Sequence, residues 1–286
     1  MLRQRFLQVG VLVSVTSALA LSAQAATFSE ANLKGRYSYM LNKWTVDVGM
    51  NQVANVGVMT FDGAGNMTGS ATKVGGGVSE GGALSGTYTV NSDGTGMIEV
   101  TSTLFNPPTI QYGFVLNSLA GGVAHGFQFM QTDNGNNVVI SGTALLQSPI
   151  AVHYSLASLK GSFALQFNAW STDPDFDEQG GIGTITFDGE GNLKESLTSV
   201  DRGEVHGVTL TGTYAVNADG SCSGSFVQPD GSMSNFACAL NSVGPLGANG
   251  FQAVVTNPQP TGADDTTNYA VTATGVKQVT QSIPIL

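Results

Sequence analysis

The sequence contains an internal duplication, and this feature limits the possible folds more than any other. Residues 33–94 align with residues 159–220 at a constant offset of 126 positions, without a gap, and 26 of the 62 aligned positions are identical. The heptapeptide TFDGAGN at 60–66 returns as TFDGEGN at 186–192. Because solenoid repeats have far shorter periods, the duplication predicts two homologous domains.

Within each unit, apolar side chains recur at every second position. In LSGTYTV, Leu84, Tyr88 and Val90 share one face, and LTGTYAV at 210–216 repeats the pattern. A period of two indicates strands with one buried and one solvated face. Gly-, Asn- and Asp-rich turns divide the first unit into eight such runs, at about 35–46, 54–61, 67–74, 83–91, 95–104, 109–117, 123–131 and 136–147.

Eight consecutive strands with short links favour an all-β protein made of two tandem antiparallel up-and-down β-barrels, since closure removes exposed strand edges. A pair of β-sandwiches is the structural alternative. The composition agrees with either, because 38 glycines in 286 residues and only 10% charged residues are typical of a turn-rich β protein. The predicted units are residues 26–148 and 149–286, and we expect them to pack on each other.

The first 25 residues have the pattern of a signal peptide. Arg3 and Arg5 precede an apolar run from residue 6 to residue 21, and Ser22 to Ala25 supply the small residues of a cleavage site. This pattern predicts export to the periplasm or the extracellular space. No other apolar stretch is long enough for a membrane-spanning helix, so no membrane span is expected.

Charge argues against one class of partner. Without residues 1–25 the chain keeps 8 Lys and Arg against 20 Asp and Glu, a formal charge of −12. Binding to nucleic acid phosphates requires clustered basic side chains. A nucleic acid partner is therefore not expected.

The two cysteines flank a turn signal. Cys222 and Cys238 lie eight residues on either side of Asp230 in QPDGSM, which places them opposite one another on a predicted hairpin. Antiparallel partners are close enough for a disulfide, and an exported protein meets an oxidising compartment. Two buried free thiols are the alternative.

The start of each unit resembles a known fold family. Gly35-x-Tyr37 and Gly161-x-Phe163 on the first strands resemble the Gly-x-Trp of calycin-type barrels such as lipocalins and avidins, with Tyr or Phe in place of Trp. The order of motifs also resembles uncharacterised exported bacterial proteins with an allene-oxide-cyclase-like barrel. The resemblance implies an eight-stranded barrel that holds a small molecule, or a cyclase- or isomerase-like activity.

The candidate ligand-binding residues are amide and aromatic side chains that recur in both units. Indole rings can stack on a ligand at a barrel mouth while amides donate hydrogen bonds, and the inward rings can line or fill the interior. Structural packing is the alternative for all of them. The candidates are Asn42, Trp44, Asn168, Trp170, Tyr37, Tyr88, Phe163 and Tyr214.

The chemical motifs are few. Alternating Asp173, Asp175 and Asp177 form a weak calcium candidate, with a solvated acidic loop as the alternative. No histidine recurs between the units, and no nucleophile elbow, phosphate-binding loop or zinc motif occurs. We therefore assign no catalytic residue and, apart from calcium, no cofactor.

The sequence favours an exported, non-enzymatic β-barrel protein that binds a small, partly apolar molecule, because eight-stranded barrels can hold one. A structural or surface-interaction module without a ligand is the first alternative. A cyclase- or isomerase-like enzyme, carried by fold analogy alone, is the second.

Overall fold

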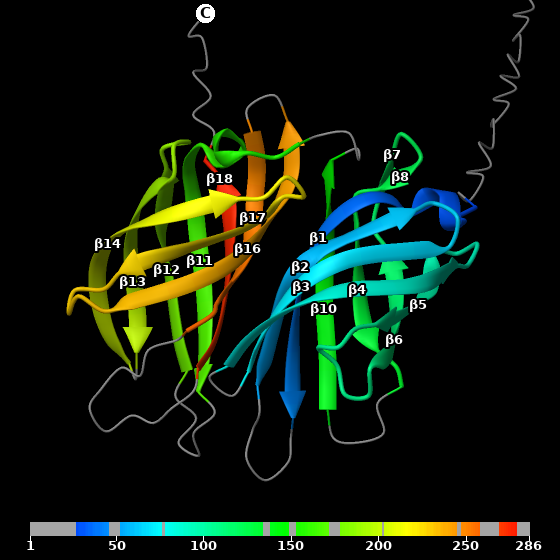
Figure 1. Cartoon of the computed structure of the whole chain (residues 1–286), viewed down its shortest axis with the longest axis horizontal. Helices are drawn as coiled ribbons and strands as arrows, with labels where there is room; N and C mark the ends of the chain where they lie inside the picture. The colour runs from blue at the N-terminus through cyan, green and yellow to red at the C-terminus, as the bar shows by residue number, and fades with distance from the viewer. Residues whose placement is uncertain are drawn as a thin grey trace, which may run out of the picture.

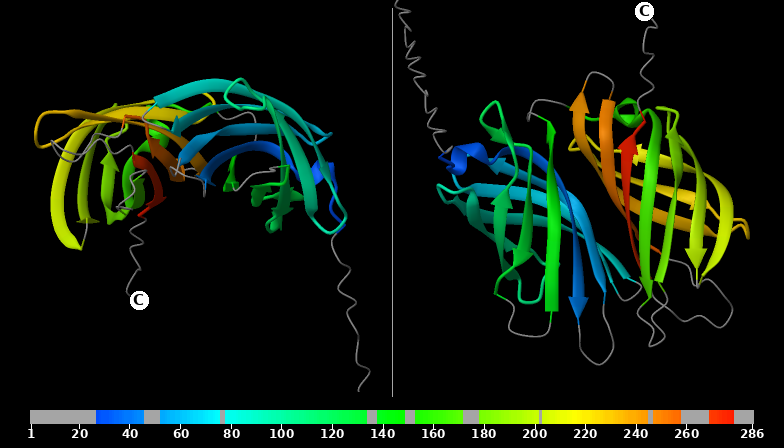
Figure 2. Two further views of the ribbon diagram at one scale, coloured as in Figure 1. Left: turned by 90° about the horizontal axis from the view of Figure 1, so that it is seen from below. Right: turned by 180° about the vertical axis from the view of Figure 1, so that it is seen from behind.

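The protein folds into two closed antiparallel β-barrels of eight strands each, which lie side by side (Figures 1 and 2). This computed structural model describes residues 27–45, 52–75, 78–133, 138–148, 153–171, 178–201, 203–244, 247–257 and 269–278. The closed strand order confirms the barrels and excludes the β-sandwich alternative. In the described part of the chain, no helix is long and apolar enough to cross a membrane.

In both barrels each strand pairs with the next along the chain, and the first pairs with the last. The strands of the first barrel are β1 (Lys34–Thr45), β2 (Val53–Asp62), β3 (Asn66–Gly75), β4 (Val78–Val90), β5 (Thr95–Thr101), β6 (Thr109–Leu116), β9 (Gly126–Gln131) and β10 (Val138–Ser148). The expected run at 123–131 is divided, because β7 (Leu119–Ala120) and β8 (Val123–Ala124) form a small separate hairpin. The strands of the second barrel are β11 (Gly161–Ser171), β12 (Glu178–Phe187), β13 (Asn192–Asp201), β14 (Glu204–Val216), β15 (Ser221–Val227), β16 (Met233–Gly244), β17 (Gly247–Val255) and β18 (Tyr269–Lys277).

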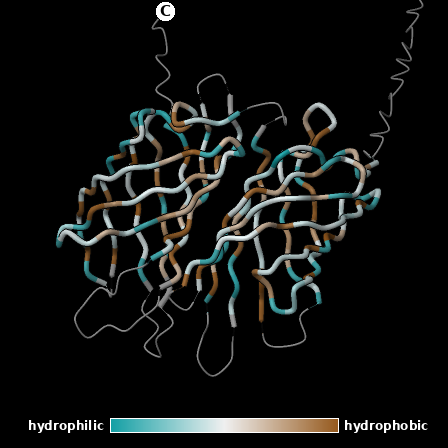
Figure 3. The backbone as a smooth tube through the Cα atoms, in the orientation of Figure 1, coloured by the Kyte–Doolittle hydropathy of each residue, from teal (hydrophilic) through white to brown (hydrophobic). Residues whose placement is uncertain are grey.

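The alternation of side chains decides which face of each strand is buried. Along β5, exposed and buried residues alternate from Thr95 to Thr101, and hydropathy alternates along the backbone of both barrels (Figure 3). Apolar side chains fill the barrel interiors because burial of apolar area is the main favourable contribution to folding.

One end of each barrel is closed by four aromatic rings at equivalent positions. The neighbouring rings lie 4.9–5.8 Å apart between centroids, mostly edge to face, a geometry that stabilises aromatic pairs beyond their buried area. A short 3-10 turn covers each cluster, η1 (Glu30–Asn32) and η2 (Leu156–Leu159). The rings are Tyr37, Phe61, Tyr88 and Phe127 in the first barrel, and Phe163, Phe187, Tyr214 and Phe251 in the second.

The repeated heptapeptide forms the same turn twice. Asp62 accepts hydrogen bonds from the backbone N–H groups of Ala64 (2.7 Å) and Asn66 (3.0 Å), and from the Asn66 side chain (2.7 Å). Asp188 accepts the equivalent three bonds at 2.7, 3.0 and 2.6 Å. Gly63 and Gly65 have φ angles of 80° and 100°, which favour glycine. The duplicated motif is therefore a tight β2–β3 or β12–β13 turn.

The two cysteines form a disulfide inside the second barrel. Cys222 on β15 and Cys238 on β16 are direct partners in the register, with Cα atoms 4.7 Å apart. Both residues are buried in the core of that barrel. The prediction from the hairpin spacing is confirmed, and a disulfide is compatible with an exported protein.

The barrels contact each other through small apolar side chains. The shared cluster contains Ala54, Val56, Val58 and Val74 of the first barrel, with Ala237, Ala239, Val254 and Ala270 of the second. Polar contacts flank it: the Ser38 hydroxyl donates to the Asn241 side chain, and the Arg36 guanidinium donates to the Ala218 carbonyl at 3.3 Å. Small side chains let the two sheets approach closely, so a continuous apolar contact joins the barrels.

Candidate functional site

The four inward aromatic candidates belong to the aromatic clusters of the barrels. Tyr37 and Phe163 are fully buried, and Tyr88 and Tyr214 are nearly so. The Tyr37 hydroxyl donates to the Ala124 carbonyl at 2.8 Å. The Tyr88 hydroxyl donates to a carbonyl near η1, and that of Tyr214 to a carbonyl of η2. These side chains therefore pack the barrel interiors, and the tyrosine hydroxyls donate their hydrogen bonds to backbone carbonyls. A role in ligand binding stays a prediction.

The opposite end of the first barrel is also filled. The rings of Tyr39 and Tyr112 each lie within about 6 Å of the Phe129 ring, and the Tyr39 hydroxyl donates to Asn55 at 2.9 Å. Burial, with the neighbouring Tyr112, raises the pKa of Tyr39 well above its usual value, so both phenols stay neutral.

A connecting segment closes that end. Residues 102–108 between β5 and β6 place Leu104 in the core with 7% of its surface exposed. The Ser102 hydroxyl donates to the Ala83 carbonyl at 2.8 Å, and the Lys73 ammonium donates to the Leu104 carbonyl at 3.1 Å. Side chains thus occupy the interior of the first barrel from end to end, which leaves its outer face for a ligand.

The amide and indole candidates do not lie inside a barrel. Asn42 and Trp44 are half-buried on the outer face of β1, opposite Tyr37 and Tyr39, and Asn168 is exposed on the outer face of β11. The side chain of Trp170 lies outside the described residues. Among the candidates of this set whose side chains the structure describes, Asn42 lines a groove.

The calcium candidate is untested by the structure. Asp173, Asp175 and Asp177 lie outside the described residues. Among the residues that are described, no group of three or more His, Cys, Asp or Glu side chains is placed to hold a metal ion. The calcium site therefore stays a prediction from sequence alone.

A groove of about 1090 Å³ runs over the outer face of the first barrel, where it meets the second. Strand register builds its floor as two rows that cross five strands, β5, β6, β9, β10 and β1. The rows are Met97, Gly113, Met130, Ser141 and Asn42, and beside them Thr95, Val115, Gln128, Thr143 and Met40.

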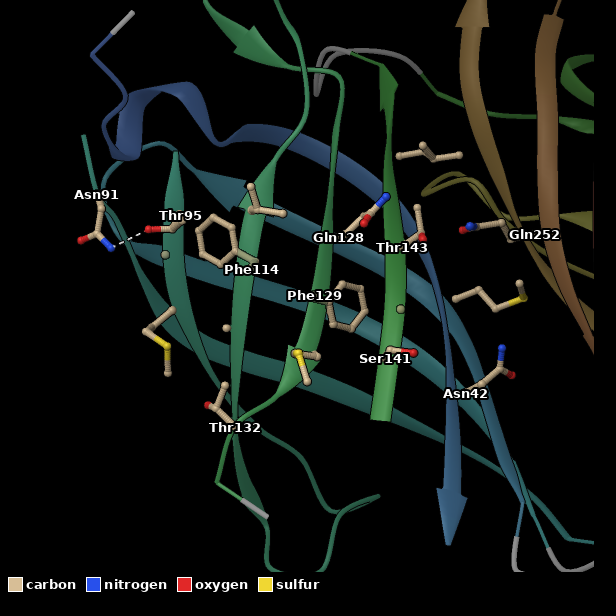
Figure 4. Close-up of a pocket in the computed structure, with 18 of the residues that line it drawn as sticks. Asn42, Asn91, Thr95, Phe114, Gln128, Phe129, Thr132, Ser141, Thr143 and Gln252 are labelled. Atoms are coloured by element: carbon tan, nitrogen blue, oxygen red, sulfur yellow. Dashed lines mark hydrogen bonds between the residues drawn. The ribbon is translucent and has the colours of Figure 1, made fainter. Parts of the chain in front are cut away.

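The second barrel supplies the far wall of the groove. Gln252 on β17 and Thr274 on β18 are register partners on the outer face, and both line the hollow. Figure 4 shows Gln252 reaching from the second barrel toward the strand that carries Thr143 and Ser141. The packing of the two barrels therefore completes a groove that lies mostly on the first barrel.

The chemistry of the groove combines apolar area with hydrogen-bonding groups and lacks charge. Met97, Val115 and Met130 keep 40–54% of their surface exposed. Gln252 is 4% exposed, and its side-chain carbonyl oxygen has no hydrogen-bond partner in the described structure. None of the lining residues is Asp, Glu, Lys, Arg or His. Such a surface suits a neutral, partly apolar molecule that offers hydrogen-bond donors.

Sequence reasoning identified one residue of this groove and missed the others. Asn42 was detectable because it recurs as Asn168. Met130, Thr143 and Gln252 carry no motif, and their proximity depends on cross-strand register and on the packing of the barrels. The exposed methionines on polar faces of strands are the one signal that a sequence could show.

Comparison with known proteins assigns this chain to no family. No protein-family model matches the chain, and no curated protein matches it. One similar solved structure is a protein of unknown function from the DUF3598 family of Nostoc punctiforme, 13% identical, covering 87% of this chain and 97% of that one, with a TM-score of 0.26. Another is transferrin binding protein B from serogroup B Neisseria meningitidis, 7% identical, covering 86% and 77% respectively, with a TM-score of 0.27. Both similarities are distant.

Proposed function

We propose that the protein is an exported, non-enzymatic binding protein whose groove on the first barrel holds a small, neutral, partly apolar molecule. The observation that carries this proposal is the unpartnered, buried Gln252 facing an uncharged groove with exposed Met97 and Met130. A buried carbonyl without a donor costs free energy, and a ligand that supplies the donor recovers it.

The size and shape of the groove support a small-molecule ligand. Its volume of about 1090 Å³ is slightly above the range of about 300–1,000 Å³ that is usual for small-molecule sites. The methionine side chains are flexible and polarisable, and they adapt to varied apolar shapes. Asn42 and Gln128 add further amides on the same floor, so several orientations of hydrogen-bond donors and acceptors can be matched.

The test uses a charge placed in the groove. We expect the purified protein, after incubation with a neutral lipid extract, to retain a small molecule in native mass spectrometry and to enhance the fluorescence of a neutral naphthylamine dye. Met130→Glu should weaken retention at least about tenfold, because a carboxylate in an apolar site must lose hydration.

A matched control variant distinguishes weaker retention caused by a charge in the groove from an effect of added surface charge in general. Ile182 is 66% exposed on the outer face of β12, and Ile182→Glu introduces the same charge outside the groove. It should retain the molecule as the wild type does. If the wild type retains nothing, or Met130→Glu retains as much as Ile182→Glu, the proposal is wrong.

A second candidate function is interaction with another macromolecule through the same face. The exposed Met97, Val115 and Met130 on a barrel with a filled interior favour it, because exposed apolar patches often mark interaction sites. If this second function is correct, Met130→Glu should lose binding of a protein partner, and neither this variant nor the wild type should retain a small molecule. That result would distinguish it from the first candidate.

A further inference from the structure

The second barrel contains a buried carboxyl group that the first barrel lacks. Glu195 lies on β13 between the inward-facing Leu193 and Leu197, at the position of Gly69 in the first unit. Its register partners are Ile185 on β12 and Leu210 on β14, both buried. The alternation of the strand therefore places the carboxyl inside the barrel, with 5% of its surface exposed.

The Glu195 carboxyl has no partner in the described part of the chain. It makes no hydrogen bond or ion pair there, and burial alone raises its pKa to about 7. An isolated buried carboxylate is expensive, and a protein normally pairs it or replaces it by an apolar residue. A group of this kind, facing an interior, is a candidate for contact with an external partner.

The interior side chains at one end of the second barrel are less covered than their counterparts in the first barrel. The inward-facing Phe167, Leu197 and Phe226 are partly exposed. Their counterparts in the first barrel, Leu41, Ala71 and Val100, are at least 93% buried.

The connection between β15 and β16 is also shorter than the equivalent connection in the first barrel, and so covers less of the interior. Residues 228–232 form a tight turn, closed by hydrogen bonds between the backbones of Gln228 and Ser232 at 2.8 Å and of Gly231 and Gln228 at 2.9 Å. The first barrel has the longer segment that inserts Leu104 at this place. Within the described residues, the second barrel therefore lacks the plug of the first.

The interior of the second barrel also has smaller side chains than the first barrel at several equivalent positions. Ala253, Gly224 and Leu165 stand where the first barrel has Phe129, Ile98 and Tyr39, while Phe167 and Phe226 place rings near the accessible end. Apolar and aromatic walls with one carboxyl at depth suit a molecule with an apolar body and one charged or polar head.

We propose that the interior of the second barrel binds a small organic cation, an amine with an aromatic or aliphatic body, with Glu195 as its counter-ion. An ammonium group recovers the electrostatic cost of the buried carboxylate, and the rings of Phe167 and Phe226 favour a cation by cation–π attraction. The acidic chain, with a formal charge of −10, attracts cations to the opening. A fatty acid or other anion would instead place a second negative charge beside Glu195. This site is separate from the groove on the first barrel.

The other titratable groups on the inward faces lie near the two ends of this barrel. Glu204 and His206 on β14 are exposed at the accessible end and lie 3.7 Å from each other. Tyr214 and Lys277 lie at the closed end, where the Lys277 ammonium is 5.8 Å from the centre of the Phe163 ring. No other titratable side chain that the structure describes faces Glu195 from β12, β14 or the strands across the barrel.

The experiment compares three probes that share one apolar body: 2-phenylethylamine, 2-phenylethanol and 3-phenylpropanoate. We expect calorimetric titration of the full chain at pH 8 to show binding of the amine, at least about tenfold weaker binding of the alcohol, and no binding of the acid. Glu195→Gln and Glu195→Leu should each weaken amine binding at least about tenfold and remove the preference for amine over alcohol.

Glu190→Gln is the matched control, since Glu190 is exposed in the turn at the other end of β13. It should bind the amine as the wild type does, and Met130→Glu should do so as well, which separates this proposal from that for the groove. Both Glu195 variants remove a costly buried carboxyl, so they are expected to fold, and circular dichroism checks this. Absence of amine binding, equal binding of amine and alcohol, or unchanged binding by folded Glu195→Gln would overturn the proposal.

Discussion

The two barrels share a plan at one end and differ at the other. Both close one end with four aromatic rings at equivalent positions under a 3-10 turn. At the opposite end, the first barrel is filled and plugged by Leu104, whereas the second has partly exposed interior side chains and a buried Glu195. The aromatic end that stabilises the fold is thus shared by the two barrels, and the opposite end differs between them.

The largest loss of stability should result from substitutions in the aromatic clusters that both barrels share. Phe127 packs against four rings, those of Tyr37, Phe61, Phe114 and Phe129, while its counterpart Phe251 packs against Phe163 and Phe187. We expect Phe127→Ala and Phe251→Ala each to lower the free energy of unfolding by about 3–5 kcal/mol, with Phe127→Ala at the upper end. Urea denaturation measures both, and hydrogen exchange assigns each loss to a barrel. A larger loss in Phe251→Ala would contradict the greater packing of the first barrel.

The disulfide should stabilise only the second barrel. Cys222 and Cys238 are 16 positions apart, and closing a loop of that length contributes about 3 kcal/mol by restricting the unfolded chain. The double variant Cys222→Ala, Cys238→Ala should lose that amount in the second barrel and leave hydrogen exchange of the first unchanged. An unchanged melting temperature on reduction would show that the bond contributes nothing.

Glu195 should make the two barrels respond differently to pH. Its pKa rises on folding from an ordinary 4.5 to about 7, so the folded state holds the proton more tightly. Relative to Glu195→Gln, the wild type should be unchanged below pH 4.5, lose stability between pH 4.5 and 7, and stay lower by about 3 kcal/mol at most above pH 7. Calorimetric melting of the two proteins from pH 4 to 8 measures this, and parallel curves would refute it.

The smallest loss of stability should result from substitution of the turn aspartates, and it should be equal in both barrels. Hydrogen bonds from Asn66 and from backbone N–H groups lower the pKa of Asp62, and the matching bonds lower that of Asp188 to about 2. A lowered carboxyl pKa stabilises the fold above the ordinary value of 3.8, and this contribution is lost as pH falls toward 2. Asp62→Ala and Asp188→Ala should each lower the melting temperature slightly and equally at pH 7. A clear difference between them would mean that the two turns are not equivalent.

Local patterns allowed much of the fold to be predicted. Period-two alternation located the strands, the Gly-, Asn- and Asp-rich segments located the turns, and the spacing around Asp230 paired Cys222 with Cys238. Each of these depends on contacts between residues near in sequence, where geometry is nearly fixed by the strand and turn types.

The two proposed binding sites could be predicted from the sequence only in small part. The groove combines Met97, Met130 and Gln252, which are brought together by register across five strands and by the packing of two domains. Glu195 was hidden because it lies in a run of inward-facing leucines, and an isolated Glu in a strand usually faces solvent. The contrast between Gly69 and Glu195 at matched positions was the available signal, and it acquires meaning only when the barrel interiors are compared.

The claim that the second barrel holds a buried, unpaired carboxyl is tested most directly by carbon-13 NMR of the Glu195 side chain. Selective labelling and the Glu195→Gln variant assign its signal, and titration gives its pKa with and without 2-phenylethylamine. The structure predicts a pKa near 7 that falls when the amine is added, because an ammonium partner stabilises the carboxylate. A pKa near 4.5 that does not respond to the amine would contradict the claim.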